Sequence, residues 1–187
     1  FPRQELMGFR KLDSMLQGHS YNGVPGIDVS TGALGQGLSI ANGMAIAGKL
    51  DGKNYKVFVL LGDGELQEGE VWEAAKSAAN YKLDNLTAIV DRNGLQQNGP
   101  TEQLMRIEPL AEKFRAFGWN VQDVNGHDIA AIMDALDAAD KVTGQPKIII
   151  ARTVKGKGVS FMENNHEWHG KAPNQEQLRL ALAELSK

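Results

Sequence analysis

The sequence predicts an α/β fold with a doubly wound, mostly parallel sheet. Short apolar runs of strand length alternate with segments that carry apolar residues at helical spacing. Continuous apolar runs are typical of parallel strands that helices cover on both faces. The length of 187 residues, with 42% apolar and 23% charged residues, suffices for a sizeable core. We therefore expect a single domain over residues 1–187.

The first predicted element is a helix at residues 35–50, which is rich in small residues along Ile40, Ala41 and Met44. Small side chains there would let a neighbouring element approach closely, although each helical glycine costs roughly 1 kcal/mol relative to alanine. Strands follow, and they are predicted at residues 56–61, 86–91, 119–124 and 147–153.

Helices are predicted between and after these strands, at residues 68–82, 107–117, 128–142 and 174–187. The last helix should begin near Pro173 or Asn174, because both residue types favour helix starts. Residues 156–173 show no periodicity, and a loop of that length is either functional or disordered.

Composition excludes several classes of function. A formal charge of −3 argues against a nucleic-acid partner. The absence of cysteine excludes disulfides, thiol nucleophiles and thiolate metal sites, and it fits a cytoplasmic protein. The longest apolar runs are far too short to span a bilayer, so no membrane partner is expected.

Polar residues follow two of the predicted strands at the point where each ends. Asp63 lies between Gly62 and Gly64 after one strand, and Asn93 follows the next. Ligands collect at the carboxyl ends of parallel strands, and neighbouring strands lie about 4.8 Å apart. The two side chains could therefore share one Mg²⁺ together with a backbone carbonyl and diphosphate oxygens. A tight turn with a helix cap explains an aspartate between two glycines equally well.

Five spaced motifs, in order, resemble the transketolase family. Gly62-Asp63-Gly64 followed after 28 residues by Asn93 is similar to the thiamine-diphosphate signature. Thr31-Gly-Ala-Leu-Gly-Gln-Gly37 resembles TTGPLGQG, and Gly62-Asp-Gly-Glu-Leu-Gln-Glu-Gly69 resembles GDGCLQEG. The set is completed by Gly126-His-Asp128 and by the stretch from Gly156-Lys-Gly158 to His166-Glu-Trp-His169-Gly-Lys-Ala-Pro173.

The resemblance implies a thiamine-diphosphate-binding fold and a diphosphate-binding domain. Its metal would be Mg²⁺, which Ca²⁺ or Mn²⁺ can replace, held by the side chains of Asp63 and Asn93 and the carbonyl of Leu95. The implied cofactor contacts are Gly32, Leu34, Gly62, Asp63, Gly64, Glu65, Asn93, Leu95 and His169.

The resemblance also implies roles in the reaction. His19 and His169 would handle protons, and Glu68 would lie buried at a subunit interface, linked to the two cofactors. The implied reaction moves a two-carbon ketol unit from a ketose phosphate to an aldose phosphate. His19 is followed by Ser-Tyr-Asn where the family has Pro-Glu, and Ala33 and Glu65 replace a common proline and cysteine.

The resemblance implies a partner as well. The family's activating glutamate lies on a pyrimidine-binding domain that no stretch of this sequence matches, so we expect a pyrimidine-binding partner subunit or domain and an α2β2-like assembly. The chain begins at Phe1, after the point where the family's first segment begins. It is therefore expected to be a piece of a longer polypeptide or the N-terminal subunit of a split transketolase, inactive alone.

Two other interpretations remain. The same cofactor could serve a 1-deoxyxylulose-phosphate synthase or a dihydroxyacetone synthase. The motifs Leu66-Gln-Glu-Gly69 and His166 to Pro173 favour a transketolase. Alternatively, the chain could be a non-catalytic scaffold that keeps the fold.

Overall fold

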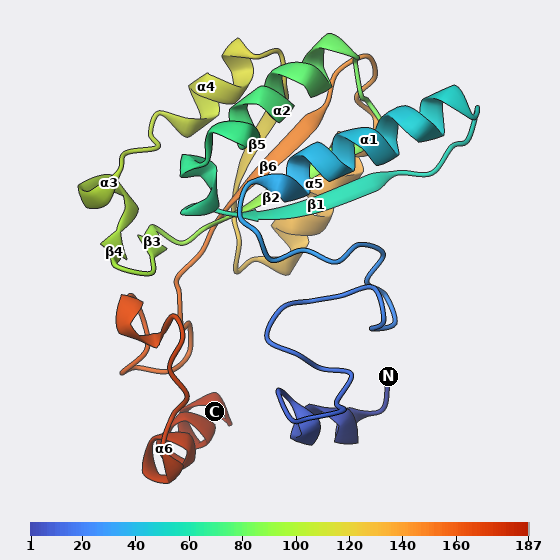
Figure 1. Ribbon diagram of the computed structural model, residues 1–187. Coiled ribbons are helices and arrows are strands. Elements are labelled where there is room, and N and C mark those ends of the chain that lie inside the picture. The colour runs from blue at the N-terminus through green and yellow to red at the C-terminus, as the bar shows by residue number, and fades with distance from the viewer. Residues whose placement is uncertain (187) are drawn as a thin grey trace.

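The computed structural model describes residues 1–186 and shows a central sheet of four strands (Figure 1). The strands are β1 (Val57–Gly62), β2 (Leu86–Arg92), β5 (Asn120–Asn125) and β6 (Lys147–Arg152). They are all parallel, in the order β1-β2-β6-β5. All four lie within one or two residues of their predicted positions, and the predicted fold class is confirmed.

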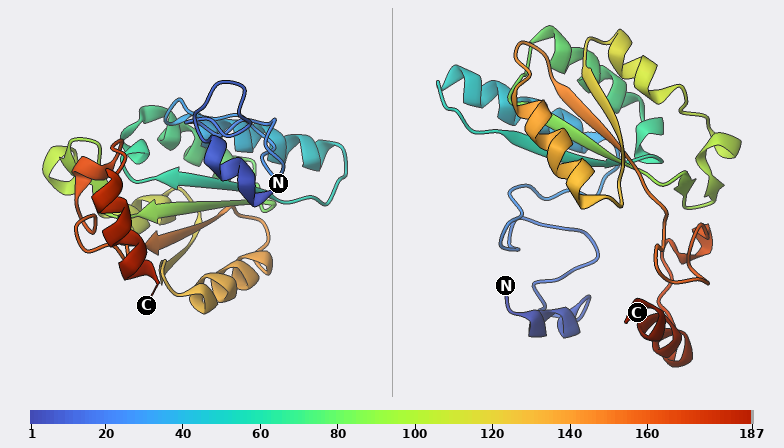
Figure 2. Two further views of the ribbon diagram at one scale, coloured as in Figure 1. Left: turned by 90° about the horizontal axis from the view of Figure 1, so that it is seen from below. Right: turned by 180° about the vertical axis from the view of Figure 1, so that it is seen from behind.

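Helices cover both faces of the sheet. α1 (Gln36–Leu50), α2 (Gly69–Asn80) and α4 (Leu110–Ala116) lie on one face, and α5 (Ile129–Asp140) lies on the other (Figure 2). The main core forms between the sheet and the first three of these helices. The sheet is therefore doubly wound, as its apolar strands predict.

The strand β1 departs from one expectation. Its alternate residues Val57 and Leu61 are buried under α1, but Phe58 and Leu60 are 55% and 70% exposed. β1 lies at the edge of the sheet, whereas α5 contacts β5 and β6 on that face. The prediction that helices cover this strand on both faces is therefore wrong for the single chain.

The helix ends follow from local chemistry. α4 begins three residues later than predicted, because the carboxylate of Glu108 accepts the N–H of Leu110 (2.7 Å) and Pro109 is extended. α6 (Gln175–Leu185) begins as predicted after Asn174, which forms reciprocal side-chain bonds with Gln177 (both 2.9 Å). Residue 187, the predicted end of that helix, lies outside the described residues.

Several elements are too short to show a hydrophobic periodicity, so the sequence pattern does not predict them. They are the hairpin of β3 (Leu95–Gln96) and β4 (Gly99–Pro100), the helix α3 (Thr101–Leu104), and the 3₁₀ helices η1 (Arg3–Gly8), η2 (Glu65–Gln67) and η3 (His166–Trp168). The hairpin directly follows Asn93 and Gly94, so it shapes the predicted site.

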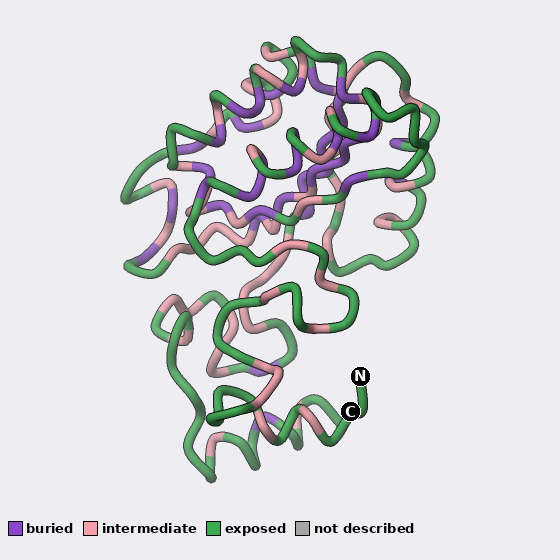
Figure 3. Tube along the Cα trace, turned by 45° about the vertical axis from the view of Figure 1, so that its right-hand side comes forward, coloured by how far each residue is buried: buried purple, intermediate pink, exposed green. Residues whose placement is uncertain are grey.

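The two terminal segments, residues 1–34 and 153–186, lie beyond the carboxyl ends of the strands, below the sheet in Figure 1. Figure 3 shows that both segments are mostly exposed, whereas the buried residues concentrate in the sheet and its helices. No helix within residues 1–186 is long and apolar enough to cross a bilayer.

Candidate functional site

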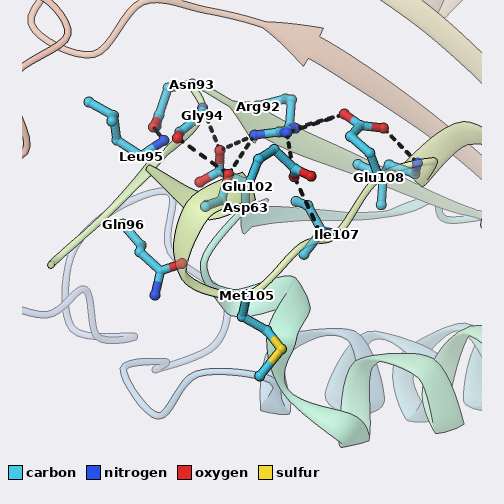
Figure 4. A network of polar contacts seen from close by, with 12 residues as sticks. Asp63, Arg92, Asn93, Gly94, Leu95, Gln96, Glu102, Met105, Ile107 and Glu108 are labelled. Atoms are coloured by element: carbon cyan, nitrogen blue, oxygen red, sulfur yellow. Dashed lines mark hydrogen bonds and ion pairs between the residues drawn. The ribbon is translucent and has the colours of Figure 1, made fainter. Parts of the chain in front are cut away.

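The two predicted motifs meet at the carboxyl edge of the sheet. β1 ends at Gly62 and β2 at Arg92, and the parallel register places Gly62 level with Asp91. Asp63 and Asn93 therefore follow the ends of neighbouring strands, as the sequence predicts (Figure 4). The backbone N–H of Gly94 donates to Asp63 Oδ2 at 2.6 Å, which joins the two loops directly.

The side chain of Asp63 is almost fully buried, with only 1% of the residue exposed. Its Oδ2 accepts from Arg92 Nη1 (2.9 Å) as well as from Gly94, and its Oδ1 accepts from the N–H of Gly64 (3.0 Å). Burial raises the pKa of the Asp63 carboxyl above its usual value, and the hydrogen bonds from Gly94 and Arg92 act in the opposite direction. A further positive charge near this carboxylate would stabilise its ionised form.

The loop after β2 presents two more oxygens. Gly94 adopts φ +80°, and Asn93 Oδ1 accepts the N–H of Leu95 at 3.0 Å. In the hairpin, Leu95 is level with Pro100. Opposed residues in an antiparallel pair alternate between hydrogen-bonded and non-hydrogen-bonded pairs. The N–H of Thr101 donates to the carbonyl of Gly94 (3.0 Å), which makes Leu95–Pro100 a non-hydrogen-bonded pair, so the hairpin gives the Leu95 carbonyl no cross-strand donor.

These three oxygens fit a divalent cation. The carboxylate of Asp63, the amide oxygen of Asn93 and the carbonyl of Leu95 are the hard ligands that Mg²⁺ takes. Within residues 1–186, no group of three or more His, Cys, Asp or Glu side chains could hold a metal by itself. A cation here would need further oxygens from water or phosphate, which is the usual arrangement for Mg²⁺ in phosphate-binding sites.

Gly64 and Glu65 fix the loop between β1 and α2. A Cβ on Gly64 would come within 3.0 Å of Gln96 Cβ, so a side chain at this position would crowd the β3–β4 hairpin. The carboxylate of Glu65 accepts the N–H of Gly35 with one oxygen and the N–H of Gly62 with the other, both at 3.0 Å. Glu65 thereby ties the start of α1 to the end of β1, a role that its position in the motif did not reveal.

A second group of predicted residues lies in a groove of about 710 Å³ beside β1 and α1. His19, Gly32, Leu34 and Glu65 all line it. A Cβ on Gly32 would lie 3.1 Å from His19 Cγ, so the imidazole packs directly against this glycine. Leu34 is 61% exposed and offers an apolar surface to the groove.

Two predicted residues stand apart from both groups. His169 is exposed at the end of η3 in the C-terminal segment, where its N–H donates to the carbonyl of His166 (2.9 Å). Glu68 precedes α2 and is exposed in the single chain, with its Cβ against Gly35. The burial of Glu68 at a subunit interface stays a prediction.

Sequence reasoning missed Arg92, whose guanidinium contacts Asp63, one of the two predicted metal ligands. Its guanidinium is buried and contacts Asp63, Thr101, Glu102 and Glu108 (Figure 4). The signal that could have found it is its place directly before Asn93, at the end of a buried strand, where an unpaired arginine would be costly.

Comparison with known proteins agrees with the resemblance of the sequence to transketolases. The family model described as "Transketolase, thiamine diphosphate binding domain" matches residues 1–185. A subunit of the apulose-4-phosphate transketolase of Actinobacillus succinogenes is 46% identical over 185 residues, which are 98% of this chain and 67% of that protein. The corresponding subunit of Phocaeicola vulgatus is 47% identical over 92% of this chain, which spans 62% of the relative's length.

Solved structures agree with these relatives. The crystal structure of transketolase from Campylobacter jejuni superposes with a TM-score of 0.90 at 35% identity, over 98% of this chain and 30% of that one. With the matched fold, the paired strand-end loops and the family model in agreement, the chain belongs to the transketolase thiamine diphosphate binding domain family.

Proposed function

We propose that this chain is the diphosphate-binding part of a transketolase that moves a two-carbon ketol unit from a ketose phosphate to an aldose phosphate. The observation that carries the proposal is the set of three oxygens at the carboxyl edge, from Asp63, Asn93 and Leu95, each with unused acceptor capacity. In this account they hold Mg²⁺, and the diphosphate supplies the remaining oxygens.

The cofactor, thiamine diphosphate, would supply the chemistry that breaks and forms the carbon–carbon bond. The chain's own residues bind and orient it. Gly32 and Leu34 offer the surface for its aminopyrimidine end, and the loop at Gly62 and Gly64 receives its diphosphate. His19 and His169 are both exposed and can hold or move protons on a sugar substrate.

The proposal includes a partner. The names of the curated relatives from A. succinogenes and P. vulgatus describe each as one subunit of a transketolase, which supports a separate subunit that carries the pyrimidine-binding domain. Two such pairs would form an α2β2 assembly with Glu68 at the interface. The composition without cysteine is compatible with a cytoplasmic assembly.

A donor panel tests this function. The native assembly, with its partner, is incubated with Mg²⁺, thiamine diphosphate, an aldose phosphate acceptor and one of three donors. We expect ketol transfer from xylulose 5-phosphate or, in line with the names of the two relatives, apulose 4-phosphate, and none from pyruvate. Turnover of pyruvate alone would indicate a 1-deoxyxylulose-phosphate synthase, and formaldehyde as the best acceptor would indicate a dihydroxyacetone synthase. A complete assembly that binds the cofactor but transfers nothing would indicate a scaffold.

A further inference from the structure

The side chain of Arg92 is the most heavily engaged group next to the proposed metal site. It is 7% exposed, and its Nη1 donates to Asp63 Oδ2 (2.9 Å) and Thr101 Oγ1 (3.0 Å). Nη2 donates to Glu102 Oε1 (3.0 Å), and Nε donates to Glu108 Oε1 (3.2 Å). The guanidinium is thus fixed on all sides (Figure 4).

Arg92 determines how many oxygens Asp63 can offer. A carboxylate has about four acceptor sites, two on each oxygen. Arg92 and Gly94 occupy both sites of Oδ2, and Gly64 occupies one site of Oδ1. One acceptor site is left, on Oδ1, so the carboxylate can give a cation a single oxygen.

We propose that Arg92 is a positioning residue that makes Asp63 a one-oxygen ligand and thereby favours Mg²⁺ over Ca²⁺. This inference rests on the proposed function. Mg²⁺ requires near-ideal octahedral geometry and takes carboxylates through single oxygens, whereas Ca²⁺ accepts six to eight ligands and both oxygens of one carboxylate. Releasing Oδ2 would therefore help Ca²⁺ and not Mg²⁺.

The acidic side chains on the far side of Arg92 make this arrangement compatible with a cation. A guanidinium beside a metal ligand would repel the metal if its charge were not balanced. Glu102 and Glu108 balance it, and both are themselves fixed, since they accept the N–H groups of Ile107 (3.2 Å) and Leu110 (2.7 Å). They hold Arg92 against Asp63.

The test compares two cations in the native assembly. Calorimetry measures the affinity for thiamine diphosphate with Mg²⁺ alone and with Ca²⁺ alone, in the wild type and in Arg92→Lys. Lysine keeps the charge but cannot make the same fixed set of bonds. We expect the Mg²⁺-supported affinity to fall on the order of tenfold and the Ca²⁺-supported affinity by no more than about twofold, as for other residues that orient metal ligands.

Arg152→Lys is the matched control, because Arg152 contacts Glu108 (3.0 Å) and Asp123 (2.7 Å) in the same network but not Asp63. It should leave the ratio of the two affinities unchanged. Glu102→Gln gives an independent variant if Arg92→Lys does not fold, and it should shift the ratio in the same direction by less. Equal losses with both cations, or an unchanged ratio in the Arg92 and Glu102 variants, would overturn the inference. A wild type that binds thiamine diphosphate with neither cation would instead refute the proposed function.

Discussion

At the scale of single residues, the proposed metal site combines a side-chain ligand with a backbone one. Asn93 would offer its amide oxygen, whereas Leu95, whose side chain is half-buried, would offer only its carbonyl. Asn93→Ala should therefore weaken Mg²⁺-dependent binding of thiamine diphosphate by about tenfold or more, since it removes an oxygen from the site. Leu95→Val should bind nearly as the wild type does.

Fluorescence or calorimetric titration of both variants in the native assembly checks this difference. An equal loss of affinity in the two variants would contradict a role of Leu95 through its backbone carbonyl alone.

The sequence predicts some residues of the site but not others, for a physical reason. Asp63 and Asn93 are predictable because each directly follows an apolar strand, and parallel neighbours bring those ends together. Arg92 and Glu65 are not, because their partners lie up to 30 residues away, on loops whose course the sequence pattern does not define. Their roles depend on which backbone N–H or carboxylate the fold brings within reach.

At the scale of elements, the start of α1 depends on one glycine. Gly35 has φ +87°, and a Cβ there would lie 2.8 Å from the Cβ of Glu68. Gly35→Ala should therefore lower the free energy of unfolding by about 2 kcal/mol through backbone strain and collision. Gly43→Ala in the same helix has nothing within 4 Å of the added Cβ and should raise stability by about 0.5–1 kcal/mol.

Denaturant unfolding of both glycine variants provides the measurement. A Gly35→Ala variant as stable as the wild type would contradict the tight contact between the start of α1 and the loop before α2.

The turn between α2 and β2 gives stability that depends on pH. Asp84 accepts from Lys49 Nζ (2.5 Å) on α1 and from the N–H of Gly144 (2.8 Å) after α5. The hydrogen bond from Lys49, followed by that from Gly144, lowers the pKa of Asp84 below its usual value of 3.8. Because the folded state binds the proton more weakly, this stabilisation is complete above pH 3.8 and is lost as the pH falls through the lower, folded-state pKa.

Asp84→Asn should accordingly destabilise the protein by about 1 kcal/mol at pH 7, since the pair is partly exposed and screened. The difference from the wild type should shrink as the pH falls below about 4. Unfolding curves at a series of pH values measure it, and Asp137→Asn on the exposed side of α5 controls for the change in net charge. A difference that stays constant with pH would contradict the assigned pKa direction.

Hydrophobic periodicity in the sequence predicts the long elements of the fold but not the shortest ones. The four strands and the long helices appear near their predicted positions, because apolar runs and helical spacing record burial against the sheet. The β3–β4 hairpin has strands of two residues each, too short for any alternation to be read. Yet this hairpin positions the Leu95 carbonyl, so a small unpredicted element completes the predicted site.

At the scale of the whole molecule, the predicted functional residues fall into three places. Asp63, Asn93 and Leu95 form the strand-end cluster, His19 and Gly32 line the groove beside β1, and His169 lies in the C-terminal segment. Sequence motifs give their order but not their spatial arrangement, which depends on the two terminal segments beyond the sheet (Figure 1). Glu68, directly before α2, lies outside these three places.

In the proposed function, the carboxyl edge of the sheet holds thiamine diphosphate through a divalent cation on Asp63. Calorimetry of the native assembly can compare Asp63→Asn with Asp91→Asn, whose carboxylate lies at the same strand ends but accepts from the hydroxyl of Thr153. We predict Mg²⁺-dependent binding in the wild type and in Asp91→Asn, and affinity lower by about a hundredfold in Asp63→Asn. Binding that survives removal of Mg²⁺ by a chelator, or that Asp63→Asn leaves unchanged, would contradict cation-dependent binding at this edge of the sheet.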